Sequence, residues 1–240
     1  DAVVSLVAGE SSGYDGGAIA LGQSLKDVGS KLHRVLLVDP EVGHARRAAL
    51  SHLWEIIEVD TIPCNHKLHP SVTSATHDLS GAGYQAGLKR FRPTCTKLAA
   101  WSLTQFNRIL FLDVDTLVVQ PMDDILYSFS NASFAACPDV FPPDNFNSGV
   151  LVLNPSKDTY QRLLEINQVV GSAEGGDQGV LNNGFCPQWN SVGAGDEYCG
   201  RLPWIFNVQA AHYENYKTLR KMSGLREPSL IHFVSDGKPW

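Results

Sequence analysis

The sequence predicts an α/β fold in which a mostly parallel, Rossmann-like sheet is flanked by helices, in a single domain over residues 1–240. Three observations support this prediction. Apolar strands alternate with amphipathic helices near the N-terminus, as they do in parallel sheets with helical crossovers. A chain of 240 residues with 43% hydrophobic content can bury a sizeable core. Finally, one apolar strand ends in two closely spaced aspartates, and open α/β sheets bind ligands at such strand ends.

The N-terminal part of the chain repeats a strand–helix unit. Its strands are short apolar runs, and its helices carry apolar side chains on one face. Gly29 follows the first helix, where a glycine is a common C-terminal cap. The predicted elements are, in order, a strand at Val3–Val7, a helix over 15–28, a strand at Val35–Val38, a helix over 42–53 and a strand at Ile56–Val59.

Residues 61–93 interrupt this alternation. A segment of this length without a predicted element is usually functional or disordered in a compact domain. It contains His66, His69 and His77, whose spacing fits no compact pattern of metal ligands. Regular structure is predicted to return as a helix over 94–105, a strand ending at Asp113, strands at Ser133–Cys137 and Gly149–Leu153, and a helix at Thr159–Val169.

The strand that ends at Asp113 carries the strongest chemical signal. Asp113 and Asp115 stand two residues apart, so their side chains point the same way and converge beyond the carboxyl end of the strand. Two oxygen donors with open positions suit Mg²⁺ or Mn²⁺ bridging to phosphates. The pair is also typical of a turn that solvates a strand end. An Asp-x-Asp-x-Thr run fits haloacid-dehalogenase-type phosphatases too, with Asp113 as nucleophile, but that motif belongs on the first strand of its fold.

Composition narrows the classes of partner and compartment. The formal charge is −6 and no run of lysine and arginine occurs, so no nucleic-acid partner is expected. No apolar stretch is long enough to span a bilayer, so no membrane association is expected either. The five cysteines form no C-x-x-C pair and their number is odd, which favours a reducing compartment over a disulfide framework. A cytoplasmic location is therefore predicted.

Four further segments add groups that a nucleotide-sugar site needs. They are Lys97–Ser102, Phe146–Leu153, Gly175–Asn182 and His232–Trp240. Gly149, at the start of a predicted strand, would let a ligand approach the backbone closely. Asp177 and Gln178 begin a predicted helix, where Asp177 also fits an ordinary cap. His232 offers a metal ligand, and Lys238 offers a positive charge for a phosphate.

Together these segments resemble glycosyltransferase family 8, most closely its glycogenin-like members, over nearly the whole chain. The matching motifs, in the order and spacing of the family, are Gly17-Ala18 to Leu25-Lys26, Thr96 to Gln105, Asp113 to Thr116, Phe146 to Gly149, Gly176 to Gly179, and His232 to Trp240. The resemblance implies a GT-A type nucleotide-sugar fold. The chain departs from the family at Ser235, where glycine is usual, at Glu174, where aspartate is usual, and in a longer turn near Ala8–Gly13.

The resemblance also implies where a UDP-hexose donor would bind. Asp113, Asp115 and His232 would hold Mn²⁺, or Mg²⁺, on the diphosphate of UDP, and Ser235 and Lys238 would contact that diphosphate. The residues implied at the nucleoside are Leu6, Tyr14 and the backbone around Val114. The residues implied around the rest of the donor are Lys97, Asp139, Asn147, Ser148, Gly149, Asp177 and Gln178, of which Lys97, Asp177 and Gln178 are the catalytic candidates.

The family implies transfer of a hexose from UDP with retention of the α configuration. We expect galactose or glucose to move to a glycan hydroxyl on a protein by same-face attack, and the other mechanism is a covalent step through Gln178 or Asp177. The alternative acceptor is the chain itself, at Tyr213 or Tyr216, as in glycogenin-type self-glucosylation that primes glycogen. A protein that binds UDP-sugars without turnover is a further alternative. A homodimer is expected from the family.

Overall fold

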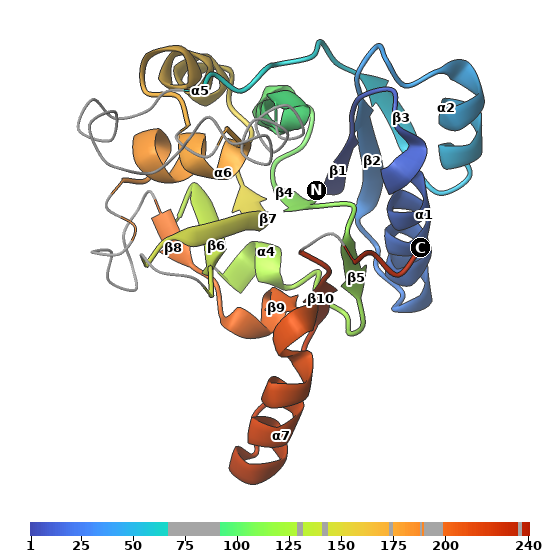
Figure 1. Ribbon diagram of the computed structural model, residues 1–240, viewed down its shortest axis with the longest axis vertical. Coiled ribbons are helices and arrows are strands. Elements are labelled where there is room, and N and C mark those ends of the chain that lie inside the picture. The colour runs from blue at the N-terminus through green and yellow to red at the C-terminus, as the bar shows by residue number, and fades with distance from the viewer. Residues whose placement is uncertain are drawn as a thin grey trace.

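The computed structural model describes residues 1–66, 92–128, 132–140, 144–172, 175–187, 189, 199–234 and 237–240. Its main feature is a seven-stranded sheet in the order β3-β2-β1-β4-β7-β6-β8, with helices on both sides (Figure 1). The strands are β1 (Ala2–Val7), β2 (His33–Val38), β3 (Glu55–Glu58), β4 (Ile109–Leu112), β6 (Phe134–Pro138), β7 (Phe146–Leu153) and β8 (Cys199–Arg201).

One half of this sheet is parallel and the other half is mixed. β1 pairs in parallel with β2 and β4, and β2 pairs in parallel with β3. β7 runs antiparallel to both of its neighbours, β4 and β6, while β6 and β8 are parallel to each other. The predicted α/β class with a mostly parallel sheet is therefore confirmed. Every residue of β4 and β7 is buried, which explains why these strands are apolar runs rather than alternating ones.

Helices cover both faces of the sheet. One face carries α1 (Asp15–Asp27), α2 (His44–Leu50) and α4 (Ile125–Ser128), and the other carries η2 (Arg92–Ser102), α5 (Lys157–Val169) and η3 (Leu181–Phe185). Leu21 and Leu25 of α1 lie in the core of the first face, and Trp101 of η2 lies in the core of the second. No helix in the described part of the chain is long and apolar enough to cross a membrane. α1 and α5 agree closely with the helices predicted from the sequence.

The segment predicted as a helix over 94–105 is a 3₁₀ helix, η2, which begins and ends earlier. A 3₁₀ helix has about three residues per turn against about 3.6 in an α-helix, and the apolar pattern of so short a segment does not separate the two periods. η2 is buried from Cys95 to Trp101 and packs against α5 and β1. This burial places Lys97 in the interior, next to the sheet.

A second sheet of three strands was not predicted from the sequence. It consists of β5 (Thr116–Val118), β10 (Leu230–His232) and β9 (Val208–Gln209), with β10 in the middle. These strands are two or three residues long, too short to leave a periodic pattern. β10 runs antiparallel to β5, with His232 opposite Thr116. The second sheet therefore brings the C-terminal segment beside the turn that follows β4.

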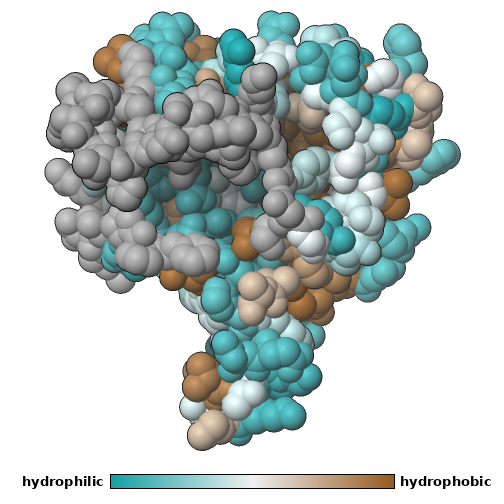
Figure 2. All heavy atoms as spheres, viewed as in Figure 1, coloured by the Kyte–Doolittle hydropathy of each residue, from teal (hydrophilic) through white to brown (hydrophobic). Residues whose placement is uncertain are grey.

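α7 (Tyr213–Ser223) projects away from both sheets as an arm (Figure 1). It ends at Gly224, whose φ of +63° is the left-handed conformation that favours glycine at a helix C-terminus. Leu219, Met222 and Leu225 are exposed, and apolar atoms show on the arm in Figure 2. These side chains take no part in the two buried cores.

The prediction that the cysteines remain reduced was wrong for four of the five. Cys64 is bonded to Cys95 and Cys186 to Cys199, while Cys137 is free and buried. The bonded residues are 31 and 13 positions apart, so neither pair forms a short motif that spacing could reveal. The odd count reflects one buried thiol rather than the absence of disulfides.

Candidate functional site

A pocket of about 670 Å³ lies beyond the carboxyl ends of β1 and β4. It has the size of a small-molecule site, at the place where open α/β sheets bind ligands. Twelve of the predicted site residues line it: Leu6, Tyr14, Lys97, Asp113, Val114, Asp115, Asn147, Ser148, Asp177, Gln178, His232 and Lys238. Asp139 and Gly149 are absent from the lining, and Ser235 lies outside the described residues.

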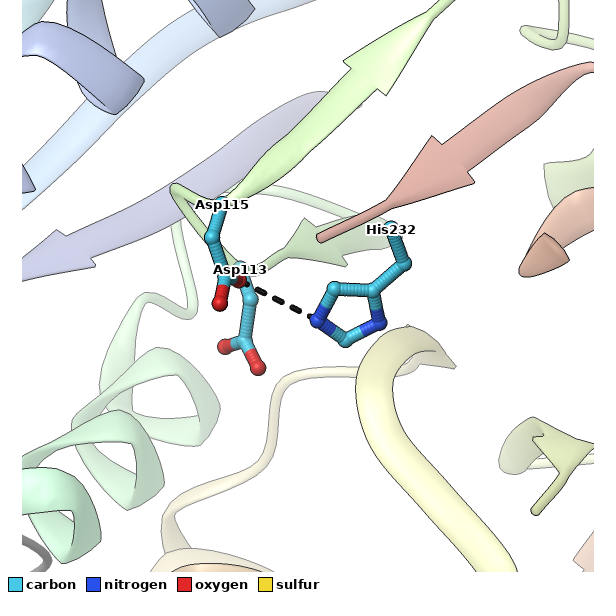
Figure 3. Close-up of side chains that lie close together, drawn as sticks. All are labelled: Asp113, Asp115 and His232. Atoms are coloured by element: carbon cyan, nitrogen blue, oxygen red, sulfur yellow. Dashed lines mark hydrogen bonds and ion pairs between the residues drawn. The ribbon is translucent and has the colours of Figure 1, made fainter. Parts of the chain in front are cut away.

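Asp113, Asp115 and His232 bring their ligating atoms within 4.8 Å of one another. The two aspartates belong to the turn after β4, and His232 ends β10 (Figure 3). Asp113 N donates to Gly149 O (2.9 Å) and the Thr116 hydroxyl donates to Asp113 O (2.7 Å), so hydrogen bonds fix the turn. Two carboxylates and an imidazole form a donor set that suits Mn²⁺ or Mg²⁺.

Hydrogen bonds determine which nitrogen of His232 is available to a metal. Its Nδ1 lies 2.8 Å from Asn207 Oδ1, and Asn207 Nδ2 donates to Asn147 Oδ1 (2.9 Å). Because Asn207 presents its oxygen, this network assigns the hydrogen to Nδ1 and leaves the lone pair on Nε2. Nε2 lies 3.1 Å from Asp115 Oδ1. Two acceptors then face each other, an arrangement that a bound cation or a second ring proton satisfies.

Gly149 lies directly behind the His232 ring. A Cβ at this position would lie 2.2 Å from His232 Cε1, so a larger residue could not be placed without moving the ring. Gly149 N also donates to Asn147 Oδ1 (3.0 Å), which helps to orient that amide. Gly149 thus shapes the metal end of the pocket from β7, and its predicted contact with a donor stays a prediction.

Asp115 is surrounded by basic groups. Its Oδ2 accepts from Lys238 Nζ (2.6 Å), which also donates to Phe233 O, and its Oδ1 faces His232. Burial alone would raise the pKa of Asp115, but Lys238 and a His232 ring that carries the second proton outweigh burial through their hydrogen bonds and charges and hold that pKa well below its usual value. Asp115 is therefore a carboxylate at any physiological pH.

Lys97 lies beside Asp113, between two carboxylates, and this part of the pocket is its Lys97 end. Its Nζ is 2.9 Å from Asp113 Oδ1 and 2.7 Å from Asp177 Oδ2, and it donates to Ser148 O (3.0 Å). The side chain is only 3% exposed. Burial would lower the pKa of Lys97, but Asp113 and Asp177 outweigh burial and raise it. Burial raises the pKa of Asp113, and the charge of Lys97 only partly opposes that rise.

Gln178 is held at both ends of its amide. Its Oε1 accepts from Ser148 N (3.1 Å), and its Nε2 donates to Asp139 Oδ2 (2.9 Å). Asp139 in turn accepts from Gln209 Nε2 (3.0 Å) through its other oxygen. Asp139 therefore acts from behind the pocket wall, which explains why it is absent from the lining. This network fixes the position of Gln178 and leaves little freedom for it to reorient.

Three residues that support the site were missed by sequence reasoning. Asn207 bonds to His232 and Gln209 bonds to Asp139, and both are buried. The Thr94 hydroxyl accepts from Asp177 N (3.1 Å) at the start of α6 (Asp177–Val180). None belongs to a short motif, because each reaches its partner through the tertiary fold. Only their polar character within apolar surroundings could have singled them out.

The two tyrosines considered as acceptors differ in their surroundings. Tyr216 is 5% exposed, packs against Trp204 with ring centroids 5.0 Å apart, and donates from its hydroxyl to Arg226 O (2.6 Å). Tyr213 is half-buried at the first position of α7. Neither is among the residues that line the pocket. Tyr216 is therefore a packed aromatic residue, and an acceptor role stays a prediction for Tyr213.

Comparison with protein families gives a match to the family model described as "Glycosyl transferase family 8" over residues 92–240. Curated relatives include glycogenin-1 of Homo sapiens, 34% identical over 95% of this chain and 59% of its own length. Glycogenin-1 of Caenorhabditis elegans is 33% identical over 95% of this chain and 48% of its own length. The chain thus spans less than two thirds of these relatives.

Solved structures of low sequence identity share the fold. A galactosyltransferase LgtC, crystallised with donor and acceptor sugar analogues, covers 100% of this chain and 89% of its own, with a TM-score of 0.65 and 16% identity. The glycosyltransferase GlyE of Streptococcus pneumoniae covers 100% of this chain and 56% of its own, with a TM-score of 0.62 and 21% identity. These similarities support the GT-A type fold that was predicted from the sequence.

Proposed function

The chain belongs to glycosyl transferase family 8, and we propose that it acts as a UDP-sugar-dependent retaining hexosyltransferase. In this proposal an α-hexose, galactose or glucose, passes from UDP to a glycan hydroxyl on a protein. The observation that carries the proposal is the cluster of Asp113, Asp115 and His232 beside Lys238, in a pocket of the size that small ligands occupy. We assign this activity to one domain over residues 1–240.

Each part of a UDP-hexose has matching groups along the pocket. Asp113, Asp115 and His232 would hold Mn²⁺ or Mg²⁺, which when bound neutralises charge on the diphosphate. Lys238 would add a second positive charge at the diphosphate. The groups that we assign to the nucleoside are Leu6, Tyr14 and the backbone at Val114. The groups that we assign to the hexose are Lys97, Asn147, Ser148, Asp177 and Gln178, with Asp139 holding Gln178 from behind the pocket wall.

The chain's own groups favour a same-face reaction. The bond between the anomeric carbon and UDP breaks with its electron pair on the departing phosphate, while the acceptor oxygen bonds to the same face of that carbon. The acceptor proton passes to the departing phosphate. A covalent route would need a free nucleophile, but Gln178 is hydrogen-bonded at both ends of its amide and Asp177 is ion-paired with Lys97. These engaged groups support the route without a glycosyl-enzyme intermediate.

The acceptor is the part of this proposal with an explicit alternative. In self-glucosylation, Tyr213 would receive the hexose, and its place at the base of the projecting α7 arm leaves it partly accessible. Tyr216 is a weaker candidate because its hydroxyl already donates to Arg226 O. We place transfer to an external glycan first, because a segment as long as 61–93 is often functional and could bind an acceptor. Residues 67–91 of this segment lie outside the described ranges.

Two further predictions accompany the proposal, a homodimer and a cytoplasmic location. No nucleic-acid or membrane partner is proposed. The disulfides Cys64–Cys95 and Cys186–Cys199 count against the cytoplasmic prediction, because disulfides persist mainly in oxidising compartments. Labelling of free thiols in the unfolded chain tests this point. Without reduction it would reveal one reactive cysteine if these bonds form and five if they do not, and after reduction it would reveal five in either case.

The experiment that tests the proposal combines hydrolysis of UDP-sugars with intact mass. UDP-glucose, UDP-galactose and other UDP-sugars are incubated with the protein and Mn²⁺, and released UDP and protein mass are measured on the same samples. We expect slow, Mn²⁺-dependent hydrolysis of a UDP-hexose without a gain in protein mass. Tyr213→Phe should hydrolyse the donor at the wild-type rate, as should Tyr216→Phe if it folds.

Other outcomes would overturn part or all of the proposal. A mass gain in hexose steps that Tyr213→Phe abolishes would replace the external acceptor with self-glucosylation. UDP binding without hydrolysis of any UDP-sugar would indicate a binding protein. Release of phosphate from simple phosphate esters, abolished by Asp113→Asn, would restore the phosphatase alternative.

A further inference from the structure

The turn over residues 9–13, whose last two residues begin the 3₁₀ helix η1 (Ser12–Tyr14), connects β1 to α1 and borders the nucleoside end of the pocket. Ala8 precedes this turn and Tyr14 follows it, and both line the pocket. Gly9 has a φ of +85°, a conformation that a residue with a side chain rarely adopts. A glycine-rich turn at the surface would ordinarily sample several conformations, so the groups that fix its shape also fix the wall of the pocket.

Arg46, from α2, binds this turn along its length. Nη1 donates to Gly9 O (2.7 Å) and Glu10 O (3.2 Å), and Nη2 donates to Ser11 O (2.8 Å). The same guanidinium grips both oxygens of Asp15, the first residue of α1, through Nε and Nη2 at 2.8 Å each. One side chain thus ties both ends of the turn together.

The carbonyl groups of the turn are all satisfied within the protein. Arg46 binds three of its carbonyls, Asp15 N donates to Ser12 O, and Trp240 Nε1 donates to Gly13 O (2.9 Å). Every carbonyl from Gly9 to Gly13 therefore has a donor. On the other side, Gly9 N donates to the buried carboxylate of Asp39 (3.1 Å). A surface turn with this many internal partners is held in one conformation.

The Arg46–Asp15 pair suits this task. Its two parallel hydrogen bonds form a planar fork that lysine cannot reproduce. The side chains of Arg46 and Asp15 are 17% and 19% exposed, so the pair is largely shielded from solvent. The hydrogen bonds that Arg46 donates to Asp15 raise the pKa of Arg46 above its usual value, which leaves the guanidinium charged at all relevant pH values.

We infer that Arg46 is a positioning residue for the nucleotide: by holding turn 9–13 in its bound shape, it preorganises the nucleoside wall formed by Ala8 and Tyr14. Arg46 binds the turn and does not line the pocket. Its effect on ligand affinity is therefore indirect, through the conformation of the turn backbone. This inference rests on the proposed function, because it requires that a uridine nucleotide occupies the pocket. Arg46 is expected to affect the affinity for the nucleoside. The affinity for the diphosphate is expected to stay the same.

The test measures binding of UDP and of pyrophosphate, each in Mn²⁺, by calorimetry. Arg46→Met should weaken UDP binding by at least about fivefold. Without the Arg46 hydrogen bonds the turn is free to change conformation, and ordering it on binding costs conformational entropy. Pyrophosphate affinity should change by less than about twofold, since Asp115 and Lys238 have no hydrogen bond to Arg46 or to the turn, although Lys238 Nζ lies 5.8 Å from the centre of the Tyr14 ring. Arg46→Lys, which keeps the charge but loses the fork, should fall between wild type and Arg46→Met.

Arg47 is the matched control on the same helix. It donates to Val42 O and Asp39 O and pairs with Glu58, but it has no hydrogen bond to the turn. Arg47→Met should lower the melting temperature as Arg46→Met does, yet keep the wild-type affinity for UDP. If both variants bind UDP as wild type does, or if both lose UDP and pyrophosphate binding equally, the inference is wrong. Failure of wild type to bind UDP would overturn the proposed function, and this inference with it.

Discussion

At one end of the pocket a single carboxylate, Asp115, faces two basic side chains, His232 and Lys238, whereas at the other end a single ammonium group, Lys97, faces two carboxylates. The pKa values reflect this difference. The pKa of Asp115 is lowered by its basic neighbours, while the pKa of Asp113 is raised by burial that Lys97 only partly offsets. Two aspartates that stand two positions apart in the sequence thus have opposite electrostatic environments.

The two lysines differ in whether they can exchange their partner for a ligand. Lys97 is almost fully buried and has every partner within the protein, so it holds η2, the turn after β4 and α6 together. Lys238 lies at the pocket surface and could leave Asp115 for a phosphate. We therefore expect changes at the Asp115 end to affect ligand binding, and changes at the Lys97 end to affect stability as well.

The largest effect is expected for Asp115→Asn. The variant keeps the size of the side chain but removes the charge that His232 and Lys238 surround. UDP-sugar hydrolysis should fall about 10²–10³-fold, the cost of losing a group that stabilises developing charge. Asp144→Asn is the control, because Asp144 is exposed and pairs with Arg201 away from the pocket lining. Wild-type activity in Asp115→Asn, measured as UDP release, would exclude a role for this end in metal binding.

The second effect concerns stability at the other end. Lys97→Met leaves the carboxylates of Asp113 and Asp177 without their shared cation, and removing one partner of a buried pair costs about 3–5 kcal/mol. Urea unfolding at neutral pH measures this loss. Lys217→Met, which removes an exposed lysine paired with Glu214, should change the free energy of unfolding by less than about 0.5 kcal/mol.

The stability loss of Lys97→Met should depend on pH. Lys97 has a raised pKa, so its stabilising contribution is complete below the ordinary lysine pKa and disappears only in strongly alkaline solution. In the variant, Asp113, whose pKa burial already raises, binds a proton more readily when folded, so acid neutralises it and relieves its repulsion with Asp177. The deficit should therefore shrink as pH falls from 7 towards about 4.5. A deficit that stays constant or grows over this range would mean that lost packing, rather than charge, is responsible.

The smallest effect is expected for Asn207→Leu. Asn207 accepts the Nδ1 hydrogen of His232, and loss of such a second-sphere partner typically weakens metal binding about 10–100-fold. Mn²⁺ affinity, followed by electron paramagnetic resonance without any sugar donor, measures this change directly. Asn207→Asp retains an oxygen acceptor and should restore much of the affinity. Equal Mn²⁺ affinity in wild type and Asn207→Leu would show that His232 needs no such orientation.

The sequence predicted the parallel half of the sheet well because the signals there are local. β1, β2 and β4 are buried apolar runs, and α1 is amphipathic with Gly29 at its end, so each is recognisable within a few residues. Asp113 and Asp115 were found for the same reason, since their spacing alone makes their side chains converge. The GT-A type fold followed from the order of such motifs along the chain.

The features that were missed depend on contacts between distant segments. β9 and β10 are too short to show a period, yet the pairing of β10 with β5 brings His232 to Asp115. The partnership of Asn207 with His232 likewise exists only once those strands are formed. The disulfides are a further example, because Cys64 and Cys95 meet only when η2 packs against the sheet. The spacing of residues in the sequence does not reveal such long-range contacts.

The most direct test of the metal–diphosphate site is calorimetric titration of UDP into the wild-type protein, once with Mn²⁺ and once with a chelator. The arrangement of Asp113, Asp115 and His232 predicts binding of one UDP per chain that requires the metal. UDP binding of equal strength in the chelator would show that the cluster holds no metal on the diphosphate. The absence of UDP binding in both conditions would contradict the proposed donor altogether.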